Sequence, residues 1–208
     1  RGRGGLHGLL AATEARESEP ERQEPRSLWG PGHAQRILKR MSVSPRHIRG
    51  RPRPGRLRAL DAWLGEAELP LLTAPAQPGR PPLAVDVGFG DGSVTALEWA
   101  RALVAQGSPC RLLGLEAEAD RVERAAREAA QTGSGALFRL GGFDVQAQLQ
   151  GELEGADVRV VRTMNVLRGY PPAQAPAIWA ELRRSLSPTG LLLEGTSDAS
   201  GHVLTALT

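Results

Sequence analysis

The chain has 208 residues, of which 26 are basic and 23 acidic, and its formal net charge is +3. This length suits one domain, or one domain with a tail. A hydrophobic fraction of 40% provides enough apolar surface for a core, which excludes a wholly disordered chain. No run of about 18 apolar residues occurs, so we expect no membrane span. The single cysteine, Cys110, excludes an internal disulfide and a multi-cysteine zinc site, which predicts a cytoplasmic protein without a metal centre.

The positive charge is concentrated near the N-terminus. Residues 1–60 hold 14 basic and 5 acidic side chains, and between Arg26 and Arg58 there are ten basic residues and no acid. This part is rich in Pro, Gly and Ser and cannot bury enough apolar surface to offset the entropy of ordering. We therefore predict a basic, largely disordered segment at 1–56 and a folded domain at 57–208. Residues 26–58 form either a solvated tail or an arm for nucleic-acid phosphates, and the scarcity of aromatic residues favours the tail.

Predicted helices and strands follow each other along the chain. After a short helix near 34–41, apolar periodicity predicts helices at 57–69, 93–106, 120–131 and 172–186. Short apolar runs predict strands at 83–87, 111–115, 136–139, 157–161 and 190–193, and a Pro/Gly-rich connector spans 70–82. The helix at 93–106 is expected to bury Val94, Leu97, Ala100, Leu103 and Val104. This alternation predicts a doubly wound α/β fold with a mostly parallel sheet.

A glycine-rich turn is the strongest chemical signal. Gly88, Gly90 and Gly92 lie between the first predicted strand and the next helix, where glycine permits positive φ and close approach of a ligand to the backbone. Their G-x-G-x-G spacing differs from the G-x-G-x-x-G of dinucleotide folds. Glu116 ends the second strand, where a carboxylate can accept hydrogen bonds from both hydroxyls of a ribose. The turn and the acid together predict a nucleoside-containing ligand.

The same residues resemble a known family, the class I S-adenosylmethionine-dependent methyltransferases. The similar segments are Asp86-Val87-Gly88-Phe89-Gly90-Asp91-Gly92, Leu113-Gly114-Leu115-Glu116, Gly142-Phe143-Asp144 and the turn and strand at 186–194. Segments 165–168 and 194–196 further resemble a bacterial group, expected to be actinobacterial. The resemblance implies a Rossmann-like sheet of seven strands. Because the chain stops soon after the fifth strand, we expect an incomplete C-terminal hairpin.

The resemblance also implies roles for particular residues toward S-adenosylmethionine. Asp86 would lie near the methionine moiety, or else cap the glycine turn. Gly88 and Gly90 would bring backbone against the cofactor, with Phe89 beside it, and Glu116 would hold the ribose. Asp144 would accept a hydrogen bond from the adenine amino group, or else form a turn.

The loop after the fourth strand is expected to border the methyl acceptor, because ligands of open α/β sheets bind beyond the carboxyl ends of the strands. Asn165 and Tyr170 are the candidate catalytic residues, and Asn165 is also expected to contact the cofactor. Either could instead have a structural role, Asn165 in a turn and Tyr170 in loop packing. Glu194 and His202 are further acid or base candidates.

The predicted function is methyl transfer from S-adenosylmethionine to an unidentified acceptor. A second hypothesis is an inactive binding protein with this fold that uses its basic arm on nucleic acid. A third is an oxidoreductase that binds a nicotinamide dinucleotide, because Glu116 and the glycine turn suit either ribose.

Overall fold

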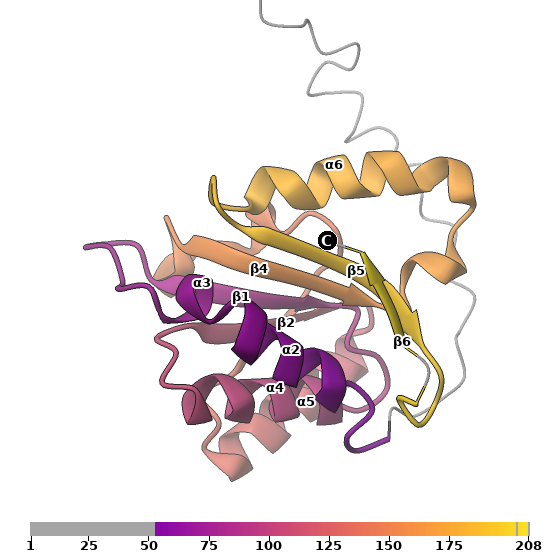
Figure 1. Cartoon of the computed structure of the whole chain (residues 1–208), viewed down its shortest axis with the longest axis horizontal. Coiled ribbons are helices and arrows are strands. Elements are labelled where there is room, and N and C mark those ends of the chain that lie inside the picture. Colours follow the sequence, from indigo (N-terminus) through magenta and orange to yellow (C-terminus); the bar gives the residue numbers. More distant parts are fainter. Residues whose placement is uncertain (1–52, 203, 208) are drawn as a thin grey trace, which may run out of the picture.

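The computed structural model describes residues 53–202 and 204–207, and these form a six-stranded sheet between helices (Figure 1). The strand order is β3-β2-β1-β4-β5-β6, with β6 antiparallel to β5 and every other pairing parallel. The strands are β1 (Pro82–Val87), β2 (Arg111–Glu116), β3 (Leu137–Leu140), β4 (Asp157–Met164), β5 (Leu191–Ser197) and β6 (Leu204–Leu207). The α-helices are α2 (Arg58–Ala67), α3 (Leu69–Thr73), α4 (Val94–Ala105), α5 (Ala119–Thr132) and α6 (Ala175–Ser185). Four 3-10 turns, η1 (Gln146–Gln148), η2 (Gly151–Leu153), η3 (Leu167–Gly169) and η4 (Pro172–Gln174), lie in the loops.

Helices cover both faces of this sheet. In Figure 1, α6 lies on one face, and α2, α3, α4 and α5 lie on the other. Successive residues of β1 point to opposite faces, so Val85 packs with Ile178 of α6 while Ala84 packs with Trp99 of α4. All six residues of β1 and all eight of β4 are buried. A polar side chain in either strand therefore needs a partner inside the protein.

The sequence predicts this fold well, with some differences. All five predicted strands are confirmed, whereas α3 and β6 were not predicted. In α4, Trp99 is buried and Val104 is 71% exposed, so the expectation for Val104 was wrong. The described residues form six strands instead of seven, and β6 pairs with β5 from Glu194–Leu207 to Ser197–Leu204. The expected helix near 34–41 and the basic segment up to residue 52 lie outside the described residues.

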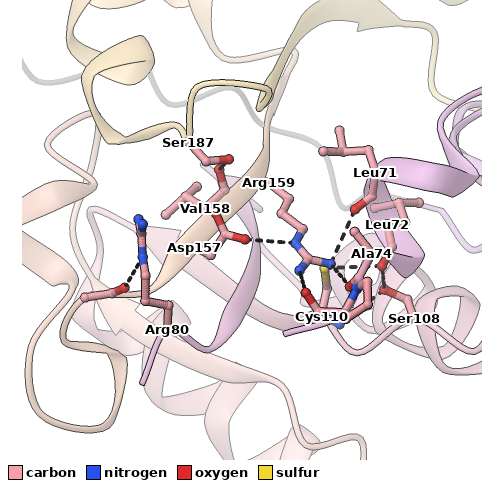
Figure 2. Close-up of polar contacts among 12 residues, drawn as sticks. Leu71, Leu72, Ala74, Arg80, Ser108, Cys110, Asp157, Val158, Arg159 and Ser187 are labelled. Carbon is pink, nitrogen blue, oxygen red and sulfur yellow. Dashed lines mark hydrogen bonds and ion pairs between the residues drawn. The ribbon is translucent and has the colours of Figure 1, made fainter. Parts of the chain in front are cut away.

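At the amino ends of the strands, a buried arginine fastens α3 to the sheet (Figure 2). Arg159 of β4 donates hydrogen bonds to the carbonyl oxygens of Ala74, at 2.6 Å, and Pro75, at 3.0 Å, and its Nε lies 3.2 Å from the Asp157 carboxylate. Nearby, burial raises the pKa of the Cys110 thiol. These contacts hold α3 and the segment after it against the amino end of β4.

No helix among the described residues is long and apolar enough to cross a membrane.

Candidate functional site

A cavity of about 370 Å³ lies at the carboxyl ends of the strands. Five strands contribute to its lining where they end or just beyond, through Val87, Glu116, Gly141, Asn165 and Ser197. The strand order reverses between β1 and β4, which is where ligands of open α/β sheets bind. Its volume is in the range of small-molecule sites. Of the predicted site residues, Asp86, Gly88, Phe89, Gly90, Glu116, Asn165 and Tyr170 line this cavity; Asp144, Glu194 and His202 do not.

The glycine turn after β1 forms one wall. Gly88 and Gly90 have φ of 73° and 79°, a backbone conformation that residues with a Cβ rarely adopt. A Cβ on Gly88 would lie 2.6 Å from Cγ2 of Val166, so the turn packs directly against the loop after β4. A Cβ on Gly90 would meet no protein atom within 4 Å. Gly90 therefore leaves open space, and a ligand can approach its backbone.

Glu116 is held by the same turn. Its Oε2 accepts a hydrogen bond from the Gly90 amide at 2.9 Å, and its Oε1 accepts one from the Ala117 amide at 2.8 Å. The Arg121 guanidinium lies 3.6 Å from Oε2. Each carboxylate oxygen can accept a further hydrogen bond. Glu116, only 7% exposed, is thus a fixed acceptor at the edge of the cavity.

Asp86, beneath the glycine turn, pairs with a fully buried arginine on β4. Nε and Nη2 of Arg162 donate to the two carboxylate oxygens of Asp86 at 3.0 and 2.9 Å, and Nη1 donates to Asp61 of α2 at 2.6 Å. The guanidinium also lies 4.1 Å from the ring centre of Trp99. Arg162 therefore joins β1, β4, α2 and α4 under the cavity floor, and both oxygens of Asp86 have a partner without any ligand.

Asp61, the second acid of this network, has a raised pKa. Burial raises the pKa of Asp61 to about 6, and Asp86 and Glu98 add to that effect, while Arg162 opposes it. Asp86 and Asp61 together raise the pKa of Arg162, which stays protonated. The network is therefore one guanidinium between two carboxylates, and its net charge depends on the proton of Asp61.

Aromatic side chains border the cavity near β2 and β3. Phe143 and Tyr170 make an edge-to-face contact with ring centres 5.2 Å apart. Burial and the nearby Glu116 carboxylate raise the pKa of Tyr170, so its phenol is neutral at physiological pH. Asp144 is exposed, and its Oδ1 accepts a hydrogen bond from the Ala147 amide at 3.2 Å. Its observed contact is the turn-forming one.

Asn165 holds the loop after β4 against β5. Its Oδ1 accepts hydrogen bonds from the Ser197 amide and the Thr196 hydroxyl, both at 3.0 Å, and its Nδ2 lies 3.1 Å from Oγ of Ser197. Its φ of 65° is the one positive value at a non-glycine residue between 53 and 202, and Asn tolerates that conformation. These contacts make Asn165 a positioning residue for the loop that carries Val166 and Tyr170.

Three arginines of the site were not singled out from the sequence. Arg162 interrupts the apolar run of β4, a pattern that indicates a buried ion pair when the strand is covered on both faces. Arg56 and Arg168 line the cavity at its β5 end. The sequence places Arg56 at the end of the predicted disordered segment, but its side chain contacts β5, and the adjacent Gly55 amide donates to the Glu98 carboxylate at 2.8 Å.

Comparisons with known proteins establish the fold. No protein-family model and no curated protein sequence matches the chain. Among solved structures, the DszA carbon methyltransferase superposes with a TM-score of 0.51 at 18% identity, over 67% of this chain and 35% of that one. A SAM-dependent methyltransferase from Thiobacillus denitrificans, in complex with S-adenosyl-L-homocysteine, has a TM-score of 0.47 and 21% identity, over 73% of this chain and 52% of that one.

The chain has the Rossmann-like fold of class I methyltransferases, with helices on both faces of a mostly parallel sheet. It spans about a third to a half of the length of the two structures just described. At these identities the likeness concerns the fold, and the function has to be argued from the site.

Proposed function

We propose that residues 57–208 bind S-adenosylmethionine and transfer its methyl group to an acceptor. The observation that carries this proposal is the joint placement of Glu116 and Gly90. A buried carboxylate, fixed by a backbone amide at 2.9 Å, faces a cavity beside a glycine whose missing side chain leaves open space. A nucleoside fits this arrangement, because its ribose hydroxyls are donors and Glu116 has free acceptor capacity.

The other lining residues fit the remaining parts of the cofactor. Phe143 and Gly142 offer an apolar surface and open backbone for the adenine beyond β3. Asp144 is outside the lining and can reach the adenine amino group only from the rim. The carboxylate of Asp86, whose orientation Arg162 fixes, would lie near the methionine moiety. Phe89, packed edge-to-face on Phe138 at 5.0 Å, stiffens the wall between these two regions.

The bound cofactor would supply an electrophilic methyl group on a sulfonium. In the proposed transfer, an acceptor lone pair would form the new bond to that methyl carbon as the carbon–sulfur bond breaks. The bond electrons would stay on sulfur, and the acceptor would give a proton to solvent. The protein's task is alignment and exclusion of water. Tyr170 remains protonated, so it acts as a hydrogen-bond donor toward the acceptor rather than as a base. Asn165 acts through the loop that it positions.

Two matched glycine variants test cofactor binding. Gly90 and Gly79 both have positive φ, at 79° and 71°, and a Cβ on either would meet no protein atom within 4 Å. Only Gly90 lines the cavity. We expect Gly90→Ala and Gly79→Ala to lose similar stability, of the order of 1 kcal/mol, while only Gly90→Ala weakens S-adenosylmethionine binding in calorimetric titration. Equal affinities for the two variants would contradict the proposed site.

The acid gives an independent test with the same assay. Glu116→Gln keeps the shape of the side chain but removes the charge, and we expect at least a tenfold loss of affinity, since hydrogen bonds to charged groups contribute about 1.5–3 kcal/mol. Glu152→Gln, an exposed acid paired with Arg111, is the matched control and should bind normally. Titration with NAD distinguishes the oxidoreductase hypothesis. Binding of NAD in place of S-adenosylmethionine would replace our proposal with that one.

Methyl transfer itself needs a separate test, because a binding protein with this fold would pass the two above. We expect the wild-type chain to release S-adenosyl-L-homocysteine when acceptor candidates are supplied. Cofactor binding without turnover for any acceptor class would favour the inactive binding protein. The arm proposed for nucleic acid at 26–58 lies largely outside the described residues, and in its described part Arg56 faces the cavity.

A further inference from the structure

The glycine turn is held by β2 and by α5, the helix that follows β2 in the chain. The Gly90 amide donates to Oε2 of Glu116 at the end of β2, at 2.9 Å. One residue further along the turn, the Asp91 carboxylate accepts a hydrogen bond from Nη2 of Arg124 in α5, also at 2.9 Å. Both partners belong to one continuous stretch of chain. A displacement of α5 would therefore move the turn relative to the acid at the cavity's edge.

The start of α4 is tied to α5 as well. Ser93, only 1% exposed, occupies the N-cap position of α4, yet its side chain makes no capping hydrogen bond to that helix. The Ser93 hydroxyl donates to the Glu128 carboxylate of α5 instead. An acid beside the amino end of a helix is favourable, because that end carries a partial positive charge. Glu128 therefore fixes the end of the turn where the chain enters α4.

A single polar stripe of α5 makes these contacts. Arg121, Arg124 and Glu128 are spaced by three and four residues, and side chains at this spacing lie on the same face of a helix. The buried residues of α5 are Ala125 and Ala129, each with only one methyl group to bury. Such small side chains provide little apolar anchoring, so the polar stripe helps to set the place of α5 beside the turn.

Arg121 is the member of this stripe that lines the cavity. Its Nη1 lies 3.6 Å from Oε2 of Glu116, and its Nη2 lies 3.1 Å from the Glu118 carboxylate. The guanidinium is thus held between two acids, and the side chain is 19% exposed. Oε2 of Glu116 receives both this cation and the Gly90 amide, while Oε1 receives the Ala117 amide. Two amides and one cation therefore surround the carboxylate and restrict its rotation.

We propose that Arg121 is a positioning residue for nucleoside recognition, because it keeps the Glu116 carboxylate oriented toward the ribose hydroxyls. This inference rests on the proposed function for the identity of the ligand, while the contact between Arg121 and Glu116 exists without a ligand. The positive charge of Arg121 offsets the cost of burying the carboxylate. Without that charge, the carboxylate would turn toward water, and its hydrogen bonds to the ribose would weaken. Arg124 and Glu128 support the arrangement by holding the glycine turn.

The ribose hydroxyls provide a readout that a purely structural residue would not change. S-adenosyl-L-homocysteine and its 2′-deoxy analogue are titrated into the full chain by calorimetry. We expect wild type to prefer the first ligand about tenfold, since the second lacks a hydrogen bond to a charged group. In Arg121→Met this preference should fall at least threefold. A smaller fall overturns the inference even where both affinities decrease, because a direct contact of Arg121 with the ligand, or a loss of stability, would weaken both ligands alike.

A second measurement needs no ligand. Hydrogen exchange of the Gly90 amide in the free chain reports how persistently that amide is bonded to Glu116. We expect at least threefold faster exchange in Arg121→Met, and a smaller acceleration overturns the inference as well. Arg127→Met is the matched control, because Arg127 is an exposed arginine of the same helix that pairs with Glu123. It should leave both measurements unchanged.

Failure of this inference is distinguishable from failure of the proposed function. If S-adenosyl-L-homocysteine does not bind to wild type, or if wild type does not distinguish the 2′-deoxy analogue, the role proposed for Glu116 is refuted. The exchange of the Gly90 amide then decides alone whether Arg121 positions the carboxylate. Arg121→Gln is a second variant, and it carries both measurements should Arg121→Met fail to fold.

Discussion

Replacing Arg162 with Met should be the most damaging single change beneath the site. The side chain is fully buried and makes hydrogen bonds to Asp86 at 2.9 and 3.0 Å, to Asp61 at 2.6 Å and to the Thr95 carbonyl oxygen at 3.3 Å. Its removal leaves two buried carboxylates without a counter-charge, which typically costs about 3–5 kcal/mol. Domains of this size are stable by about 5–15 kcal/mol. We expect the free energy of unfolding to fall by that cost at pH 7.

Urea denaturation followed by tryptophan fluorescence measures this loss, because Trp99 lies against the guanidinium. The control is a triple variant, Asp61→Asn, Asp86→Asn and Arg162→Met, in which none of the three charges of this network remains. It should recover much of the lost stability, since the penalty comes from the unpaired acids rather than from the missing arginine. Arg162→Lys keeps the positive charge but not the forked guanidinium, so its free energy of unfolding should lie between those of the wild type and Arg162→Met. A loss below 1 kcal/mol in Arg162→Met, or no recovery in the triple variant, would refute the reasoning.

Three further outcomes are expected. The pKa of Asp61 is about 6 against an ordinary 3.8, so its protonation stabilises the fold fully below pH 3.8. This contribution to the free energy of unfolding, about 3 kcal/mol, is lost as the pH rises to 6. Urea titrations of Asp61→Asn should lack that part of the pH dependence. A Cβ on Gly114 would lie 2.5 Å from the Phe138 ring, so Gly114→Ala should cost about 1–3 kcal/mol in a thermal melt, and an unchanged melting temperature would contradict this overpacking. Asn165→Gly can keep the positive φ but loses the contacts to Ser197, so its free energy of unfolding should fall by about 1–2 kcal/mol. Asn165→Ala should lose about 1 kcal/mol more, because alanine rarely adopts positive φ. Equal stability of the two variants would show that the backbone conformation is not strained.

The sequence predicts the central sheet because its strands are apolar on both sides and alternate with periodic helices. Such patterns are local, so they can be read without knowing the fold. α3 was missed because its five residues include Pro70 and lie within a connector that reads as irregular. β6 was missed because a four-residue edge strand has little signal of its own and forms through pairing with β5.

The candidate site likewise has residues that the sequence predicts and contacts that only the structure shows. Gly88, Gly90 and Glu116 could be found because a glycine turn and an acid at strand ends have a recognisable spacing. The geometry adds what spacing cannot give: Asp86 has its own buried cation, and the amide of Asn165 is occupied by β5. Each of these contacts joins residues more than 30 positions apart, and one strand-end motif carries no information about such a partner.

β4 explains why these distant contacts occur together. It is central in the sheet, and within four residues it carries Arg162 beneath the cavity and leads into Asn165 at the cavity's edge. The first ties β4 to β1 and α2, and the second ties it to β5. Because a shift of β4 by one residue would turn Arg162 toward the opposite, apolar face of the sheet, its burial between Asp86 and Asp61 fixes the register. The same register sets where Asn165 leaves the sheet, and through Val166 it determines how closely the loop approaches Gly88. The ion network therefore shapes a cavity that Arg162 does not itself line.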